Sequence, residues 1–252
     1  MSPDTVQQTP YETLAGIYDY VMRHVDYDHW AAYLDSILQR FDHHPRNLVD
    51  LACGTGNITA ELSRLDYQVA GVDSSASMIR VAREKASSIP FFQGDLRQLS
   101  SVGPFEAAVC VYDSFNYLLT PEDIKKSFET IFRILLPQSL FIFDVCTEQN
   151  SLRYFNDVRD NDEGPGFSYE RHSYYERTSK LQYNHFLIRF EAREEVLEEI
   201  HTQRIYPWKE LIELIEASPF ELLEAFDGFT FKKGSARSDR IHFVLRHPGQ
   251  ET

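Results

Sequence analysis

The chain has 252 residues, a formal net charge of −14 and a pI near 5.0. This acidic balance argues against binding to nucleic acid, which usually requires a basic surface. No apolar run is long enough to span a bilayer, and the first ten residues lack the basic and apolar segments of a secretory signal. We therefore expect a cytoplasmic protein whose partners are neither nucleic acid nor membrane.

Cys53, Cys110 and Cys146 are the three cysteines, and each lies in or beside an expected strand. A low and odd number without metal-type spacing predicts reduced thiols and no metal site. Cys53 falls in a glycine-rich loop, but no His or Lys is close to it in sequence to activate its thiol. We therefore expect Cys53 to pack, not to act as a nucleophile.

Strands and helices are predicted to alternate in the first half of the chain. After a loose leader over residues 1–10, two helices are expected. The clearer one carries apolar side chains at three- and four-residue spacing: Trp30, Tyr33, Leu34, Ile37, Leu38 and Phe41. Strands are then expected at 48–52, 68–73, 91–93, 107–112 and 140–145, with helices at 57–65, around 78–82 and at 121–136. This alternation predicts an α/β fold with a doubly wound parallel sheet.

The alternation stops after residue 145. Residues 156–166 are polar and predict a loop, and an antiparallel meander with period-two alternation is expected at 167–177, 181–191 and 196–206. A helix from Pro207 and strands at 222–226 and 241–245 resume the α/β pattern. We therefore expect one domain formed by 1–146 and 207–252, with 147–206 as an antiparallel β insert that serves as a lid or as an element of a homodimer.

Residues 49–56 read VDLACGTG and join an expected strand to an expected helix. Gly54 and Gly56 can adopt positive φ, and without a Cβ they let a ligand approach the backbone. A glycine-tight turn between a strand and a helix also directs N–H groups at a ligand. An ordinary tight turn is the alternative, and Asp50 beside the loop favours the ligand site.

Polar residues follow the next strands at the same edge of the predicted sheet. Asp73 ends the second strand about twenty residues after the loop, where a carboxylate can bind a ribose diol, although it could simply cap the next helix. Asp95 follows the third strand and is either an adenine contact or a turn residue. The fourth strand ends in the cluster YDSFNY, which begins with Tyr112 and Asp113. Together these positions predict one ligand site at the carboxyl edge of the sheet.

The segments DLACGTG, GVDSSASMI, FFQGDLRQL and VYDSFNYL, in this order and spacing, closely resemble the motifs of class I S-adenosylmethionine-dependent methyltransferases. The resemblance covers about residues 11–146. Finer details are similar to a bacterial and archaeal subgroup that includes amino-sugar N-methyltransferases. It implies a Rossmann-like, seven-stranded sheet with one antiparallel strand, an N-terminal helical cover and an insert after strand five. The family's usual Pro-Gly-Gly before strand five is Pro137-Gln138-Ser139 here, and its usual glycine before strand six is Pro219. Both departures lie far from the site and affect turn geometry.

The resemblance implies S-adenosylmethionine as cofactor. Gly54 and Gly56 would lie beside its methionine part, Asp73 at the ribose, Asp95 with Leu96 at the adenine, and Tyr18 and Tyr11 over it. The further cofactor residues would be Trp30, Asp50, Ala52, Cys53, Ser74, Met78, Tyr112 and Asp113. A dinucleotide-dependent dehydrogenase is disfavoured, because Thr59 stands where that fingerprint needs a third glycine.

Methyl transfer needs alignment above all, and a base only if the nucleophile must lose a proton. His201, or the Tyr112-Asp113 pair, is the candidate base, and His201 could equally be a structural residue. Arg204 is expected to pair with Glu199, and the run 194–199 to be solvated. The basic cluster of Lys232, Lys233, Arg237 and Arg240 is interpreted as a hairpin surface.

A small molecule, either an amine or another polar metabolite, is the expected methyl acceptor, and N-methylation is the expected reaction. An acidic chain would attract a cationic amine. Two alternatives stay open. An RNA methyltransferase should show a basic face or an added RNA-binding module. A cofactor-binding protein without catalysis would keep the cofactor motifs and lack turnover.

Overall fold

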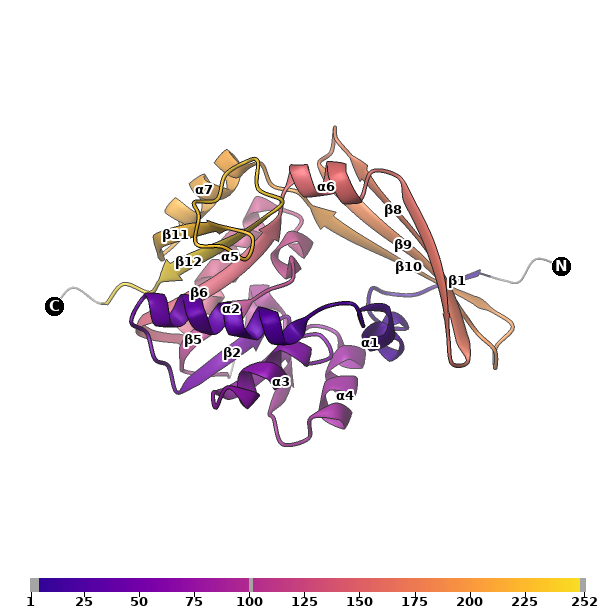
Figure 1. The fold of residues 1–252 in the computed structure, drawn as a ribbon, viewed down its shortest axis with the longest axis horizontal. Helices are drawn as coiled ribbons and strands as arrows, with labels where there is room; N and C mark the ends of the chain where they lie inside the picture. Colours follow the sequence, from indigo (N-terminus) through magenta and orange to yellow (C-terminus); the bar gives the residue numbers. More distant parts are fainter. Residues whose placement is uncertain (1–4, 100–101, 250–252) are drawn as a thin grey trace.

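The computed structural model describes residues 5–99 and 102–249, and two sheets organise it. A seven-stranded sheet flanked by helices forms the main body, and a five-stranded sheet stands beyond its edge (Figure 1). None of the helices among the described residues is long and apolar enough to cross a membrane.

The seven-stranded sheet has the order β4 (Phe91–Gln93), β3 (Gln68–Asp73), β2 (Asn47–Leu51), β5 (Phe105–Cys110), β6 (Leu135–Cys146), β12 (Arg240–Arg246) and β11 (Glu221–Asp227). Neighbours from β4 to β6 are parallel, and β12 runs antiparallel to both β6 and β11. The prediction of a doubly wound α/β sheet with one antiparallel strand is therefore confirmed. Because strand order reverses between β2 and β5, their carboxyl ends open a crevice for a ligand.

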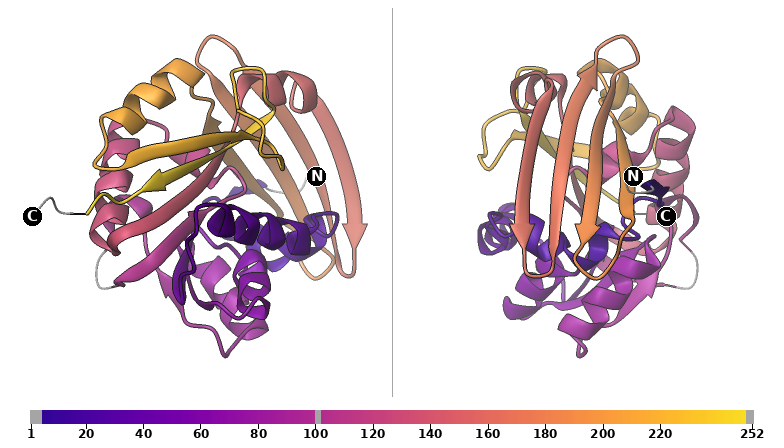
Figure 2. Two further views of the ribbon diagram at one scale, coloured as in Figure 1. Left: turned by 60° about the vertical axis from the view of Figure 1, so that its left-hand side comes forward. Right: turned by 90° about the vertical axis from the view of Figure 1, so that its right-hand side faces the viewer.

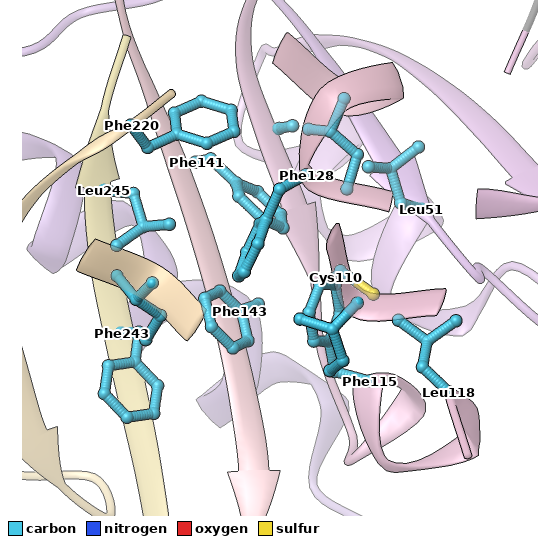
Figure 3. Packing of buried hydrophobic residues seen from close by; sticks show 14 of the residues in the cluster. Leu51, Cys110, Phe115, Leu118, Phe128, Phe141, Phe143, Phe220, Phe243 and Leu245 are labelled. Atoms are coloured by element: carbon cyan, nitrogen blue, oxygen red, sulfur yellow. The ribbon is translucent and has the colours of Figure 1, made fainter. Parts of the chain in front are cut away.

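Alternating residues of the central strands supply two apolar cores, one on each face of the sheet. Val49, Ala108 and Phe141 face the core beneath α5 (Pro121–Arg133) and α7 (Trp208–Glu216). Their sequence neighbours at 48, 109 and 142 face the core beneath α2 (Tyr27–Arg40) and α3 (Asn57–Arg64). Figure 3 shows the first core, where the Phe128 ring of α5 meets the Phe141 and Phe143 rings of β6 edge to face.

The remaining helices are short or lie near the sheet edge. They are η1 (Leu14–Gly16), α1 (Tyr18–Val21), α4 (Ala76–Lys85), η2 (Leu96–Gln98), η3 (Ser114–Tyr117) and α6 (Glu148–Tyr154). The helix predicted for 121–136 ends at Arg133, and β6 already begins at Leu135. The N-terminal elements η1 and α1 lie between the two sheets (Figure 1), where they can cover a site at the sheet edge.

The five-stranded sheet has the order β1 (Thr5–Gln7), β10 (Val196–Arg204), β9 (Leu181–Phe190), β8 (Phe167–Glu176) and β7 (Val158–Gly164). The three predicted strands of the insert are present as an antiparallel meander. The loop predicted for 156–166 is wrong, because β7 pairs with β8 there, and the leader contains β1, which pairs in parallel with β10. One face of this sheet is turned away from the rest of the molecule (Figure 2).

Polar side chains explain why β7 was missed. In this strand Asp160 forms an ion pair with Arg171, and Asp162 forms one with Arg23, at 2.6 Å in each case. The strand reads Val-Arg-Asp-Asn-Asp-Glu-Gly, with Val158 as its one large apolar residue, so a pattern based on apolar residues cannot detect it.

Candidate active site

A cavity of about 620 Å³ lies between the carboxyl edge of the seven-stranded sheet and the inner face of the five-stranded sheet. The N-terminal cover, which we define as residues 11–22, lies over it, and Tyr11 and Tyr18 of this cover line its wall. Strand ends, cover and insert thus meet at one cavity.

The glycine loop forms one wall of the cavity. Ala52 and Gly54 both have φ of 57°, and a Cβ placed on Gly54 would meet no atom within 4 Å. Gly54 is therefore open toward the cavity. Gly56, with φ of 78°, is the N-cap residue of α3, and a Cβ there would lie 2.8 Å from Phe91. Gly56 serves the turn and its packing, and it does not line the cavity.

Two buried carboxylates stand behind this loop. Asp73 accepts hydrogen bonds of 2.8 Å from the backbone N–H groups of Gly54 and Ser75, and burial raises its pKa although both bonds oppose the shift. Asp50 accepts a 2.6 Å bond from the Thr59 hydroxyl, and burial raises its pKa to about 7. Thr59 stands where a dinucleotide-binding fold needs its third glycine. Its hydroxyl thus holds the Asp50 carboxylate at the cavity wall.

Asp95 differs from those two because it is partly exposed. Its carboxylate pairs with Arg97 at 2.6 Å and caps η2, and the Arg97 hydrogen bond lowers its pKa. Asp95 and Leu96 line the cavity, as do the other expected residues Ser74, Met78 and Cys53. Burial raises the pKa of all three thiols, so none has the character of a nucleophile.

The N-terminal cover is fastened to the glycine loop by Asp19. Its carboxylate accepts hydrogen bonds from Thr55 at 2.6 Å and Asn57 at 3.0 Å, and it pairs with Lys85 at 2.7 Å. Trp30, expected to contact the cofactor, is not in the cavity wall. Its ring instead lies behind Tyr112, with a centroid separation of 5.3 Å, so Trp30 supports the wall from outside.

Tyr112 and Asp113, expected as cofactor or catalytic residues, follow β5 and line the cavity. Both have positive φ, 64° and 51°, a strained conformation for residues with side chains. Arg240 holds Asp113 at 2.8 Å and also contacts the buried Asp144, while Gln203 donates a 2.5 Å bond to Asp113. The interpretation of Arg240 as part of a hairpin surface is therefore wrong, because it lies in the cavity wall.

His201 lies on the inner face of the insert, buried and in the cavity wall. Its Nε2 is 3.1 Å from Glu199, and its Nδ1 is 3.4 Å from the Tyr117 hydroxyl. Tyr117 in turn meets the Tyr11 hydroxyl at 2.5 Å. The expectation of a solvated Glu199 is wrong, and so is its pairing with Arg204, which binds Glu210 at 2.9 Å.

Sequence reasoning missed Tyr117, Gln203 and Arg240 as members of the wall. Tyr117 belongs to the aromatic cluster after β5, and this cluster was the signal that could have found it. Gln203 follows His201 by two residues, so period-two alternation places both on one face of β10. Among the described residues, no group of three His, Cys, Asp or Glu side chains could hold a metal ion.

The strand order and the glycine loop after β2 define a Rossmann-like fold, to which a second sheet adds a wall. A family profile described as a methyltransferase domain matches residues 48–138. The putative methyltransferase YqeM of Bacillus subtilis (strain 168) is 31% identical over 239 residues, which cover 92% of this chain and 95% of that protein.

Two further relatives extend the comparison. The crystal structure of an S-adenosylmethionine-dependent methyltransferase from Clostridium acetobutylicum ATCC 824 matches with a TM-score of 0.79 and 25% identity, covering 95% of this chain and 99% of that one. A dTDP-3-amino-3,6-dideoxy-alpha-D-glucopyranose N,N-dimethyltransferase from Streptomyces fradiae is 28% identical over 133 residues, 52% of each chain. The chain belongs to the class I S-adenosylmethionine-dependent methyltransferases.

Proposed function

We propose that this enzyme transfers the methyl group of S-adenosylmethionine to a nitrogen atom of a small polar acceptor. The observation that carries the proposal is the difference between the two walls of one cavity. The strand ends of the seven-stranded sheet present an open glycine and two buried carboxylates. The inner face of the insert presents His201, Ser173, Asn184 and Gln203. One wall suits the cofactor and the other suits a polar acceptor.

The residues of the first wall fit the cofactor. Gly54 leaves room for its methionine part, because no atom lies near its absent Cβ. Asp73 uses one site on each oxygen for backbone N–H groups, and a carboxylate has about four acceptor sites in all, so a ribose diol can still bind. Asp95 with Leu96 would meet the adenine, and the other contacts would come from Tyr11, Tyr18, Asp50, Ala52, Cys53, Ser74, Met78, Tyr112 and Asp113.

The second wall suits an acceptor rich in hydrogen-bonding groups. Ser173 and Asn184 form a 2.7 Å hydrogen bond across β8 and β9, and Asn184 is opposite His201 on β10. The net charge of −14 attracts cations. The relative from Streptomyces fradiae acts on an amino sugar, which supports an amine acceptor of this kind.

Alignment of nucleophile and methyl group would supply most of the catalysis, and such positioning can lower a barrier by roughly 7–11 kcal/mol. S-adenosylmethionine, when bound, supplies a methyl group on a positively charged sulfur. The cover and the insert form part of the wall of the site. His201, reached through the Tyr117 hydroxyl, would take the proton that the amine gives up.

Two measurements test the proposal. Isothermal titration calorimetry should show binding of S-adenosylmethionine and of its demethylated product without added metal. Transfer of a labelled methyl group should then be assayed with dTDP-linked amino sugars and simple polar amines, with bulk transfer RNA as control. Folded protein that binds neither cofactor form, or that methylates transfer RNA and no small amine, would overturn the proposal.

A further inference from the structure

The buried carboxylate of Glu199 has four hydrogen-bond partners. One carboxylate oxygen accepts from the backbone N–H groups of Thr13 at 2.5 Å and Leu14 at 2.8 Å. The other accepts from the N–H of Tyr11 at 2.8 Å and faces His201 Nε2 at 3.1 Å. All four acceptor sites of the carboxylate are thus filled, although the residue lies about 190 positions away from three of its partners.

This arrangement requires an ionised carboxylate. A protonated oxygen would direct its hydrogen at an N–H group, and both oxygens already face N–H donors. Burial raises the pKa of Glu199, but the bonds from His201, Leu14 and Thr13 outweigh burial and lower it. An anion beside His201 Nε2 then requires a hydrogen on that nitrogen.

The tautomer of His201 determines what its other nitrogen can do. With the hydrogen on Nε2, a neutral ring has its lone pair on Nδ1, which faces the Tyr117 hydroxyl at 3.4 Å. Tyr11, Tyr117 and Phe186 surround the ring. Glu199 also holds the backbone of residues 11–14, so the same carboxylate orients His201 and places the Tyr11 hydroxyl 2.5 Å from Tyr117.

We propose that Glu199 is a positioning residue for methyl transfer: it fixes the Nε2–H tautomer of His201 and seats the N-terminal cover against Tyr117. This inference rests on the proposed function. When the amine attacks, its N–C bond forms, the C–S bond breaks and the electron pair goes to sulfur. The ammonium proton passes to the Tyr117 oxygen while the Tyr117 hydroxyl proton moves to His201 Nδ1. The resulting imidazolium is stabilised by the Glu199 anion.

The first test is the His201 tautomer, and it needs no acceptor. Nitrogen-15 spectra of histidine-labelled protein with the demethylated cofactor bound should show hydrogen on Nε2 and a lone pair on Nδ1 of His201. The Glu199→Gln variant replaces one oxygen by an NH₂ donor, so a folded variant should lose this preference. A wild-type His201 with hydrogen on Nδ1, or a preference unchanged in Glu199→Gln, would overturn the proposal.

The second test measures turnover with dTDP-3-amino-3,6-dideoxy-α-D-glucopyranose. Glu199→Gln should lower kcat roughly 10- to 100-fold, because a positioned base contributes about 10²–10⁴ in rate. Glu198→Gln is the matched control, since Glu198 pairs with His185 on the opposite face of the sheet. The control should leave kcat unchanged. An equal loss in both variants, or no loss in Glu199→Gln, would contradict the positioning role.

Tyr117→Phe keeps the test decisive if Glu199→Gln does not fold. It removes the hydroxyl between the amine and His201, so kcat should fall while the His201 tautomer stays that of wild type. Unchanged kcat in Tyr117→Phe would overturn the proposed proton path. A wild-type protein that methylates no amine but has the Nε2–H tautomer, lost in Glu199→Gln, would refute the proposed function and leave the structural part of this inference standing.

Discussion

The two faces of the five-stranded sheet carry the same kind of residue pair in different surroundings. On the inner face, Glu199 and His201 are both buried at the cavity wall. On the outer face, Glu198 and His185 form an equivalent pair, whose side chains are 16% and 29% exposed. The inner pair also binds the backbone of the N-terminal cover, whereas the outer carboxylate has a side-chain amide, Gln7, as its further partner. What covers a strand, more than its residue types, decides what a Glu–His pair can do.

The same contrast holds for the other polar residues of the two faces. Inside, Gln182 donates to Gln203 at 2.9 Å, and Gln203 donates to Asp113, so each amide has a fixed partner. Outside, Arg189 pairs with Glu170 on an exposed surface, with side chains 41% and 58% exposed. Buried networks of this kind fix one geometry, while exposed pairs contribute little.

The largest expected effect comes from Glu199→Ala. The change leaves three backbone N–H groups and His201 without their acceptor, and removing one partner of a buried pair typically costs about 3–5 kcal/mol. Urea unfolding followed by circular dichroism should show this loss of stability. A loss below about 1 kcal/mol, as for an exposed pair, would erase the distinction between the two faces.

The Asp50→Asn variant tests the contrast between buried and exposed groups through the pH dependence of stability. Burial raises the pKa of Asp50 to about 7, so the folded state holds a proton that the unfolded state releases near pH 4. Wild-type stability is therefore lost through this group as pH rises from about 4 to 7, with no further change above 7. Relative to wild type, the free energy of unfolding of Asp50→Asn should rise by on the order of 1–4 kcal/mol between pH 4 and pH 7.

Asp95→Asn is the exposed control for that experiment. Its hydrogen bond to Arg97 lowers the pKa of Asp95, so this group stabilises the fold above its ordinary pKa and loses that effect as pH falls. The sign is opposite to that of Asp50. Urea unfolding at a series of pH values measures both variants, and parallel curves for wild type and Asp50→Asn would contradict the prediction.

Asp73→Ala extends the comparison to the cofactor wall. Losing a charge-assisted hydrogen bond typically costs about 1.5–3 kcal/mol, so affinity for S-adenosylmethionine should fall roughly 10- to 100-fold. The backbone of Gly54 and Ser75 also loses its acceptor. Calorimetric titration measures the change, and a 2′-deoxy cofactor analogue should bind wild type more weakly than the natural cofactor. Wild type that binds both equally would argue against the ribose contact.

The smallest effect is expected on the outer face. Glu198→Ala breaks a pair that is partly open to solvent, and exposed pairs contribute about 0–1 kcal/mol. Stability and cofactor affinity should both stay close to wild type. A destabilisation as large as that of Glu199→Ala would show that burial by the cover is not what separates the two faces.

The cavity wall at the carboxyl edge of the seven-stranded sheet could be predicted from sequence because its signals are local. The glycine loop, Asp73 and Asp95 each follow a recognisable strand, and parallel strands bring their carboxyl ends to one edge. The sheet therefore brings these residues together, although they are distant from one another in sequence. Trp30 was assigned to this wall on the resemblance alone, and its place behind Tyr112 depends on packing that no short segment encodes.

The insert wall could not be predicted in the same way. Glu199 stands at the end of an acidic run typical of a solvated segment, and its burial depends on backbone N–H groups of residues 11–14. Arg240 follows Lys232, Lys233 and Arg237 in sequence, but those three are exposed whereas Arg240 begins β12 beside Asp144. In both cases the partner that buries the charge is far away in the chain.

The parallel pairing of β1 with β10 also bears on the order in which the chain becomes structured during its synthesis. Thr5 is opposite Val196, so β1 has no partner until β10, about 190 residues later in the chain, has left the ribosome. At about 5–20 residues per second, that interval lasts roughly 10–40 s. The cover over the cavity can close only after the insert exists. A ribosome-bound chain that ends before β10 should therefore expose its N-terminal segment to proteases, while the full-length protein should protect it.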